Sequence, residues 1–399
     1  MHTRPLGLVE LSIPDAGLSP ASLGRALWAA LAHDVCAHLR SDGLPTVAGI
    51  AEGGIAAAAA AAPPCLAPRQ RSVERAVPAS VIVATRNRPE TLLACLSSLS
   101  ALEHPPFEII VVDNAPSSDA TREVVEAFRR ADRPAPVARY LRTERPGLAA
   151  AHNTGLGVAR GDIVAFTDDD VLVDPYWLAE LGAGFDIAPD VGCVTGLILP
   201  AELDTVAQVR AEQRWGFGKG FVRRVYDLGP HRPSDQLFPY TAGSFGSGAN
   251  MAFRREVLEN VGGFDPVMGT GTPARGGDDL LAFFTIITQG WKLVYEPAAI
   301  VHHRNHRTVA ALRRQAFGYG AGLTAFLARV LAREPGRLRE VVPRVPGGAA
   351  HLARARGRPC RGDAVGRDWL LGGIEALGAL WGPVGLALSL RDHNRASGG

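Results

Sequence analysis

Short apolar runs alternate with helical patterns through the middle of the 399-residue chain. From Val77 onward, the segments ASVIVAT, FEIIVVDN, VARYLRT and DIVAFTDDD have the length and the Val and Ile content of strands. A helix is predicted between the first two, because Leu92, Leu96 and Leu99 share one face and Pro89 suits a first helical turn. This alternation predicts an α/β fold, with a Rossmann-like, mostly parallel sheet flanked by helices.

The N-terminal region has a different pattern. The stretch LGLVELSI predicts a short strand, and a helix follows in which apolar residues recur every four positions. We therefore expect a small βα module over 1–52 and an Ala/Pro-rich linker over 53–76. The α/β domain should then occupy 77–306, and a helical, Arg-rich extension should occupy 307–399.

That extension ends in an apolar stretch, LLGGIEALGALWGPVGLALSL, at 370–390. It approaches the length of a bilayer span, but Glu375 and Pro383 interrupt it, and a central charge costs about 2.5 to 3.5 kcal/mol on insertion. Leu370, Trp381 and Leu388 belong to a single apolar stripe. Two interpretations stay open: an interfacial helix on an anionic membrane, or a helical cap packed on the α/β domain.

Composition narrows the class of protein. The chain is 47% hydrophobic and 21% charged, as expected for a soluble globular protein with a sizeable core. Its five cysteines show no CxxC spacing, so the spacing suggests neither a zinc site nor a disulfide framework. Polar residues interrupt any apolar core of a secretory signal near the N-terminus, so we expect a cytoplasmic protein, peripheral on the membrane at most.

Charge is concentrated in the extension. Between Arg304 and Arg367 the chain carries fourteen arginines and no lysine against three acidic residues, a net charge of +11. Such a segment attracts anions, although a solvated Arg-biased surface would look the same. Aromatic residues are not interleaved with these arginines, which disfavours nucleic acid as a partner.

Polar side chains follow three of the predicted strands at their carboxyl ends. These groups are Thr85-Arg86-Asn87, Asp113-Asn114 and Asp168-Asp169-Asp170. Parallel sheets bind ligands at this edge, so the three groups should face one crevice. Adjacent carboxylates repel one another unless a cation neutralises them, and oxygen ligands suit Mg²⁺ or Mn²⁺, usually together with a substrate phosphate. The pattern therefore predicts a metal site for a nucleoside diphosphate.

Two later motifs add candidate chemistry. Asp278 and Asp279 follow a glycine pair at the start of an apolar helix. Helix capping explains one acidic residue better than two, and a general base aimed at a substrate hydroxyl is an equally good interpretation. The strand LVYEPAAIV ends near three histidines, of which we expect His303 to be a metal ligand.

Six segments in this order resemble the family 2 nucleotide-sugar glycosyltransferases, which have the GT-A fold. They are SVIVATRNRPETLLACLSSL, IIVVDNAPSSD, GLAAAHNTGLGVARGDIVAFTDDDV, GSGANMAFRREVLENVGGFD, GGDDLLAFFTIITQGW and VYEPAAIVHHR. The resemblance covers roughly 77–306. Each segment alone is a weak signal, but six in the family's order are specific.

The resemblance implies a role for each matching position. Asp168 and Asp170 stand at the metal-binding DxD positions, and His303 is similar to a late histidine that completes the metal shell in some members. Asp279, beside Asp278, matches the aspartate that deprotonates the acceptor. The implied donor-binding residues are Thr85, Arg86, Asn87, Asp113, Asn153, Asp168, Asp169, Gly248 and Asn250.

The implied activity is metal-dependent, inverting transfer of a sugar from a nucleotide-sugar donor to a glycan or lipid-linked acceptor. The sequence departs from the family at His152, where many members have Arg, and at Asp278, where Glu is usual. Leu281 and Thr285 also replace an Asp and an Arg, which favours an atypical acceptor. A non-catalytic sugar-nucleotide binder is one alternative. A nucleotidyltransferase is another, but TRNRPE lacks the glycines of a phosphate loop.

Overall fold

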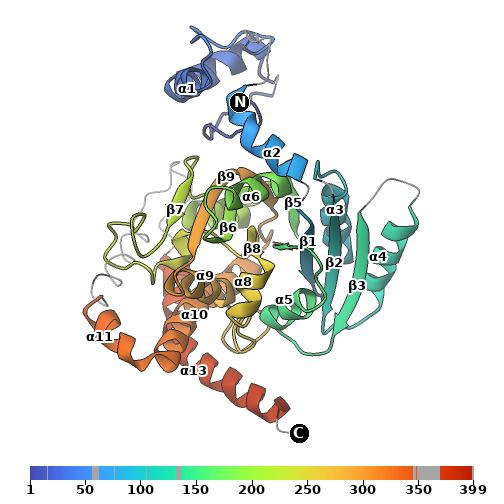
Figure 1. The fold of residues 1–399 in the computed structure, drawn as a ribbon, viewed down its shortest axis with the longest axis vertical. Coiled ribbons are helices and arrows are strands. Elements are labelled where there is room, and N and C mark those ends of the chain that lie inside the picture. Colours follow the sequence, from blue (N-terminus) through green and yellow to red (C-terminus); the bar gives the residue numbers. More distant parts are fainter. Residues whose placement is uncertain are drawn as a thin grey trace.

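The computed structural model describes residues 1–15, 17–55, 63–75, 77–104, 106–131, 136–344, 347 and 369–397. A nine-stranded sheet forms the centre of the molecule (Figure 1), in the order β3-β2-β1-β4-β8-β6-β9-β5, with β7 pairing with β9. The strands are β1 (Ala79–Thr85), β2 (Phe107–Asn114), β3 (Val137–Thr143), β4 (Ile163–Asp168), β5 (Val171–Val173), β6 (Val191–Pro200), β7 (Arg224–Tyr226), β8 (Met251–Arg254) and β9 (Lys292–His303).

The first half of this sheet confirms the predicted parallel arrangement. Strands β1, β2, β3 and β4 pair in parallel, and their register aligns Thr85 with Asp113 and Ala84 with Asp168. The second half is mixed, because β8 runs antiparallel between β4 and β6, while β5 and β7 run antiparallel to β9. The carboxyl ends of β1, β2 and β4 therefore lie side by side, as the sequence predicted.

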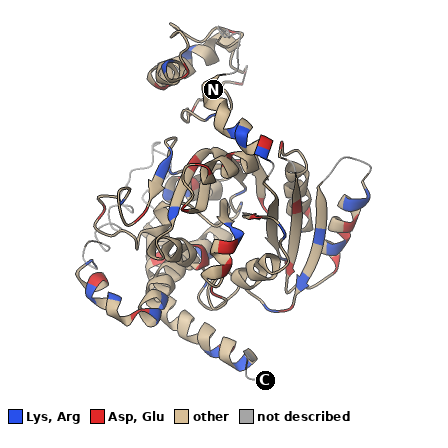
Figure 2. Ribbon diagram, in the orientation of Figure 1, with Lys and Arg blue, Asp and Glu red and all other residues tan. Residues whose placement is uncertain are grey.

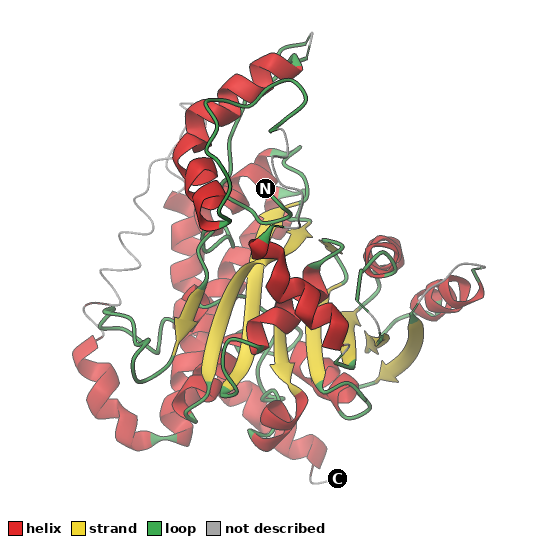
Figure 3. Cartoon of the chain, turned by 45° about the horizontal axis from the view of Figure 1, so that its top comes forward, coloured by secondary structure: helices red, strands yellow, loops and turns green. Residues whose placement is uncertain are grey.

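Helices cover both faces of the sheet (Figure 3). They are α3 (Pro89–Leu99), α4 (Ala120–Arg130), α5 (Leu148–Leu156), α6 (Trp177–Phe185), α7 (Val206–Trp215), α8 (Arg255–Asn260) and α9 (Asp278–Thr288). Alternate residues of β1 belong to different cores: Ile82 packs with α5, α8 and α9, whereas Val81 packs with α3, α4 and α6. This division follows from the two-residue period of a strand buried on both faces.

The N-terminal region forms a small lobe beside the sheet (Figures 1 and 3). Its predicted helix is present as α1 (Pro20–Ser41), capped by Ser19. The predicted strand is wrong: residues 6–13 are irregular, since no neighbouring strand offers them hydrogen bonds. The predicted linker is partly helical, with η1 (Pro64–Leu66) and then α2 (Ala67–Arg75), which packs on α6. Residues 56–62 and 76 of that linker lie outside the described residues.

The extension after β9 is helical, as predicted. It comprises α10 (Val309–Arg333), η3 (Pro335–Arg337), α11 (Leu338–Val341), η4 (Val342–Arg344) and α13 (Trp369–Ser397). Helices α10 and α13 pack closely because their contact uses glycines, and a Cβ added at Gly378 would lie 2.1 Å from the carbonyl oxygen of Phe317. Residues 345, 346 and 348–368, with five of the predicted arginines, lie outside the described residues.

The opposite face of α13 is apolar and exposed. Leu377 and Leu380 are 60% and 76% exposed, and no charged side chain lies between Glu375 and Arg391 (Figure 2). By length and composition this helix passes as a membrane span over Trp369–Ala396, but soluble core helices pass the same test. The glycine face of α13 packs on α10, so the helix caps the domain on one side. Its other face carries the exposed leucine stripe, Leu377 and Leu380, which has no partner among the described residues.

Candidate active site

The acidic strand end and the last long strand meet in one cluster. Strand β4 ends at Asp168, and β9 ends at His303, whose backbone pairs with Val171 of β5. Ligand atoms of Asp168, Asp170 and His303 all lie within 4.8 Å of one another. These are the three residues for which the sequence predicted a metal role, and the fold brings them together.

The middle aspartate points to different partners. Asp169 accepts hydrogen bonds from Thr85 Oγ1 at 2.6 Å and from an Arg88 nitrogen at 3.0 Å. Arg88 also donates to Asp170 at 2.7 Å. The Arg88 side chain, at the N-terminus of α3, thus offsets part of the carboxylate charge. Sequence reasoning passed over Arg88, although it lies three residues after β1 and beside the predicted crevice.

The acidic cluster has the chemistry of a divalent-cation site. Burial, together with the charge of Asp170, raises the pKa of Asp168 to about 7. Burial opposes ionisation of Asp170, but its contacts with His303 and Arg88 lower its pKa to about 2. Asp170 Oδ1 lies 3.3 Å from His303 Nε2 yet has no hydrogen-bond partner among the described residues. Carboxylate oxygens, one of them unsatisfied, with an imidazole fit Mn²⁺ or Mg²⁺.

A second acidic pair begins helix α9. Asp279 is half-buried, and its Oδ2 accepts a hydrogen bond from the backbone N–H of Gly248 at 3.0 Å. Asp278 is buried, and burial and the neighbouring Asp279 raise its pKa to about 8. Asp278 is therefore mostly protonated at neutral pH, whereas Asp279 is the carboxylate that solvent reaches.

Two nitrogen-bearing side chains, Lys219 and His152, lie near that pair. Burial lowers the pKa of Lys219, which lies close enough to Asp279 for the two charges to interact. His152 is fully buried, and burial lowers its pKa to about 3. Its Nδ1 lies 3.8 Å from Asp278 Oδ2, and its ring packs on Phe166 and Phe264. The departure from Arg at this position thus places a neutral ring beside a protonated carboxyl group.

Aromatic side chains lie beside the site, among them Tyr319 of helix α10. The Phe217 ring lies 5.8 Å from the ring of His303 and 6.3 Å from that of Tyr319, which also contacts Trp215. Burial raises the pKa of Tyr319, and the charges of Asp279, Asp168 and Asp170 raise it further. Tyr319 therefore lies near both acidic groups. This proximity was not predicted from the sequence, because α10 follows the segment that resembles a known family.

The predicted donor-binding residues of the first two strand ends lie at the carboxyl edge of the sheet. Asn87 adopts a left-handed conformation with φ of 56° and accepts hydrogen bonds from the N–H and Oγ of Ser117. Arg86 is exposed beside it. Asp113 is buried and accepts a hydrogen bond from the Tyr140 hydroxyl at 3.0 Å. Their contacts with a donor stay a prediction.

Two other predicted donor-binding residues brace the fold. Both ends of the Asn153 amide bond the backbone of Phe264, at 2.7 and 2.9 Å. Asn250 is fully buried, accepts from Trp177 Nε1 and donates to the carbonyls of Leu197 and Ala299. These amides are already occupied, so their effect on a donor would be exerted through the position of the backbone. Sequence motifs alone do not distinguish such braces from ligand contacts.

Comparisons with known proteins agree with this geometry. Residues 80–262 match the family described as Glycosyl transferase family 2. A pre-mycofactocin glycosyltransferase of Mycobacterium tuberculosis is 30% identical over 252 residues, which is 63% of this chain and 47% of the relative. A glucosyl-dolichyl phosphate glucuronosyltransferase of Haloferax volcanii is 26% identical over 247 residues, covering 56% of this chain and 68% of the relative.

Among solved structures, a mannosyltransferase from Pyrobaculum calidifontis in complex with GDP-Man and Mn²⁺ aligns with a TM-score of 0.46 and 24% identity. The alignment covers 78% of this chain and 85% of that one. The chain spans about half the length of the mycobacterial relative. Residues 1–79 and 263–399 lie outside the matched family segment.

Proposed function

Because the chain belongs to glycosyltransferase family 2 and has the GT-A fold, we propose that it transfers a sugar from a nucleotide-sugar donor to an acceptor hydroxyl, inverting the anomeric configuration. One observation carries the proposal. The cluster of Asp168, Asp170 and His303 lies at the carboxyl edge of the sheet, near a solvent-accessible Asp279. This arrangement supports a metal-binding role for the cluster and a general-base role for Asp279, at the edge where parallel sheets bind ligands.

Asp168, Asp170 and His303 would hold the divalent cation, with the donor diphosphate completing its shell. When bound, the cation stabilises the negative charge that develops on the departing nucleoside diphosphate. Thr85 and Asp113, at the ends of β1 and β2, lie where the nucleoside part of the donor would extend from that diphosphate. Arg88 favours the ionised forms of Asp169 and Asp170 through its two ion pairs, and in Asp169 it opposes the rise in pKa that burial causes.

Asp279 serves as the general base. The acceptor hydroxyl oxygen attacks the anomeric carbon, the bond from that carbon to the diphosphate oxygen breaks, and the hydroxyl proton passes to Asp279. Burial raises the pKa of Asp279, but the backbone N–H of Gly248 and the charge of Lys219 oppose that rise and favour the ionised form that a base requires. Asp278 is protonated at neutral pH and is therefore unsuited to that step.

We propose a glycan or lipid-linked acceptor. The name of the Haloferax volcanii relative describes a dolichyl phosphate acceptor for that protein. In this chain, the leucine stripe of α13 would lie on an anionic membrane surface and bring the site to such an acceptor. Flotation with anionic liposomes tests the contact, and Leu377→Gln with Leu380→Gln should abolish it. Val222→Gln, at another exposed apolar residue, should not. Equal flotation of both variants would refute the membrane contact.

A screen of UDP- and GDP-sugars for Mn²⁺-dependent release of the nucleoside diphosphate tests the function. Glycan and lipid-phosphate acceptors are added, and the anomeric configuration of the product is read by NMR. The products also separate the alternatives, since a nucleotidyltransferase consumes or releases pyrophosphate and a non-catalytic binder retains the intact donor. Either outcome, or retention of configuration, would refute the proposal.

A further inference from the structure

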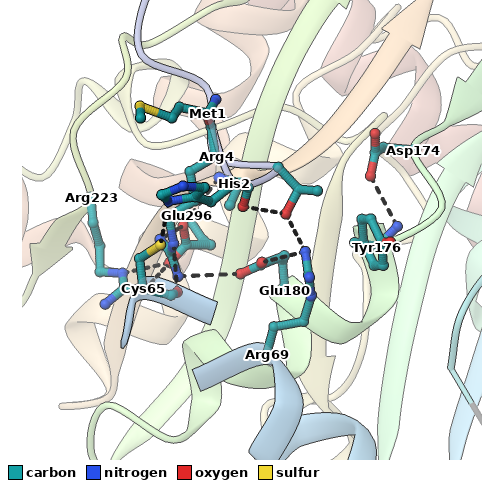
Figure 4. A network of polar contacts seen from close by, with 12 residues as sticks. Met1, His2, Arg4, Cys65, Arg69, Asp174, Tyr176, Glu180, Arg223 and Glu296 are labelled. Atoms are coloured by element: carbon teal, nitrogen blue, oxygen red, sulfur yellow. Dashed lines mark hydrogen bonds and ion pairs between the residues drawn. The ribbon is translucent and has the colours of Figure 1, made fainter. Parts of the chain in front are cut away.

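A second cluster of potential metal ligands lies in the N-terminal lobe, away from the candidate active site. It joins residues from three segments: His2 near the N-terminus, His38 and Asp42 at the end of α1, and Cys65 in η1. Figure 4 shows His2 and Cys65 side by side. None of these residues belongs to the segment that matches the glycosyltransferase family.

The atoms of this cluster converge on a point. His2 Nδ1 lies 3.0 Å from Asp42 Oδ2, 3.2 Å from His38 Nε2 and 3.5 Å from Cys65 Sγ. His38 Nε2 lies 3.3 Å from Asp42 Oδ2 and 3.6 Å from Cys65 Sγ. Each imidazole thus directs one nitrogen at three partners. An imidazole nitrogen has a single in-plane hydrogen or lone pair, so hydrogen bonds alone do not satisfy this arrangement.

The nitrogen–sulfur separations match those of tetrahedral zinc ligands, whereas His2 Nδ1 lies somewhat closer than that to Asp42 Oδ2 and His38 Nε2, at 3.0 and 3.2 Å. Imidazole nitrogen and carboxylate oxygen lie about 2.0 to 2.2 Å from zinc and thiolate sulfur about 2.3 Å, which separates the ligand atoms by roughly 3.3 to 3.6 Å. The nitrogen–sulfur distances here are 3.5 and 3.6 Å. A Cys–His–Asp catalytic triad has a different geometry, because its carboxylate contacts the ring nitrogen that faces away from the sulfur.

The ligands also have supporting contacts. The other carboxylate oxygen of Asp42, Oδ1, accepts a hydrogen bond from the backbone N–H of Cys65 at 2.9 Å. That bond fixes the direction of Oδ2, as outer contacts of metal ligands commonly do. Asp42 is buried and the other three side chains are half-buried.

The lobe needs such a link because its apolar core is small. Among the described residues of 1–66, Val35 and Leu39 are the buried large apolar side chains, at 4% and 3% exposure. A segment of this size with so little buried area is usually held by disulfides or a metal. The free thiol of Cys65 and the free thiol of Cys36 form no disulfide.

We propose that His2, His38, Asp42 and Cys65 bind one structural Zn²⁺ that fastens the N-terminal segment to α1 and η1. Mixed nitrogen, sulfur and oxygen ligands in a four-coordinate closed site select zinc over Mg²⁺ or Mn²⁺. Binding replaces the thiol proton of Cys65 with the metal, and the proton is released to solvent.

The zinc site would also position the contact with the catalytic domain. Arg4 donates to the carbonyl of Cys65 at 3.0 Å and reaches Glu180 of α6 and Glu296 of β9, each at 3.6 Å (Figure 4). Arg69 of α2 approaches Glu180 from the other side at 3.8 Å. Loss of zinc should therefore loosen this polar contact, none of whose residues belongs to the candidate active site.

Elemental analysis of the untagged full-length chain, purified with a thiol reductant, tests the proposal. We expect one zinc per chain, reduced at least tenfold in Cys65→Ala and in His38→Ala. The matched controls Cys36→Ser and His33→Ala, also on α1, should retain it, as should Asp170→Asn, which removes a ligand from the other cluster. Loss of zinc in Asp170→Asn, with zinc retained in Cys65→Ala, would overturn the assignment.

Cobalt gives an independent readout. After chelation, Co²⁺ should produce thiolate charge-transfer and tetrahedral d–d absorption in the wild type and in Cys36→Ser, and neither band in Cys65→Ala. Limited proteolysis should cut zinc-free protein within residues 1–75 at least tenfold faster than loaded protein. A soluble, folded wild-type chain with no bound zinc and no cobalt spectrum would refute the proposal.

Discussion

The two ligand clusters differ in where the chain places them. Asp168, Asp170 and His303 lie at or next to the ends of strands. These strands belong to a nine-stranded sheet with a large buried core. In the N-terminal lobe, the ligands are joined by one helix end, a 3-10 turn and an irregular terminus, with almost no apolar core. The first cluster is supported by the fold, whereas the second would support the fold around it.

The two clusters also differ in the chemistry of their ligands. The strand-end cluster has three candidate ligands, mainly oxygen, which suits an exchangeable cation that shares its shell with a substrate diphosphate. The lobe cluster has two imidazoles, a thiol and a carboxylate in a closed arrangement, which suits a resident zinc. Loss of a ligand should therefore abolish catalysis at the first cluster and affect local stability at the second.

The largest effect is expected at the strand-end cluster. Asp170→Asn removes a carboxylate ligand and its ion pairs with Arg88 and His303, and we expect turnover to fall by about 10³-fold or more. The fold should persist, because a strand-end carboxylate contributes little packing. Steady-state release of nucleoside diphosphate measures the loss, and circular dichroism controls for folding. Turnover within tenfold of the wild type would contradict the metal assignment.

The general base comes next. Asp279→Asn should lower kcat by about 10² to 10⁴, with donor affinity nearly unchanged, because proton transfer is lost while the metal cluster is intact. Asp278→Asn should cost less than tenfold, since this buried carboxyl group is already protonated at neutral pH. Rates and donor binding are measured on both variants. A greater loss in Asp278→Asn would exchange the two roles.

The sequence predicted one of these regions well and the other poorly, for physical reasons. Asp168 and Asp170 were predictable because parallel strands bring their carboxyl ends to one edge, so position along the chain implies position in space. No such rule relates His2, His38 and Cys65, which are far apart in the sequence and converge only through the path of an irregular segment. The interpretation of the cysteines from their spacing therefore contained no sign of the cluster.

The same contrast applies within the active site. Arg88 and Tyr319 reach the acidic cluster from a helix start and from α10, and neither has a motif of its own. Asn153 and Asn250 do lie in motifs, yet their amides bond the backbone of neighbouring elements. The predicted strand at residues 6–13 failed because a strand needs a partner, which local hydrophobicity does not provide.

A smaller effect should follow from removing the cation beside Asp279. Burial raises the pKa of Asp279 and the charge of Lys219 opposes that rise, so Lys219→Met should raise the pKa further. Asp279 acts as a base only above its pKa. The acid limb of the kcat/KM profile should therefore move to higher pH, with a loss of less than about 10² in rate at pH 7. Lys219→Arg should return the acid limb of the profile to its wild-type position. An acid limb that does not shift in Lys219→Met would contradict the interaction between Lys219 and Asp279.

The smallest effect concerns the contact of the lobe with the domain. Burial raises the pKa of Glu180 to about 7, against an ordinary value near 4.5. Folding therefore favours the protonated form, and this stabilisation is lost as the pH rises from about 4.5 to about 7, by roughly 3 kcal/mol. Glu180→Gln should melt like the wild type at pH 5 and at a higher temperature at pH 8.5. A lower melting temperature at both pH values would show that the ion pairs with Arg4 and Arg69 outweigh burial.

The most direct test of the contrast is calorimetric titration of UDP and GDP, in the presence of Mn²⁺, into wild-type protein, Asp170→Asn and Cys65→Ala. The strand-end cluster should hold the cation that binds the donor diphosphate, and the lobe cluster should not take part. We therefore expect binding of the preferred nucleotide to be equal in the wild type and Cys65→Ala and to be lost in Asp170→Asn. Unchanged nucleotide affinity in Asp170→Asn would contradict the account.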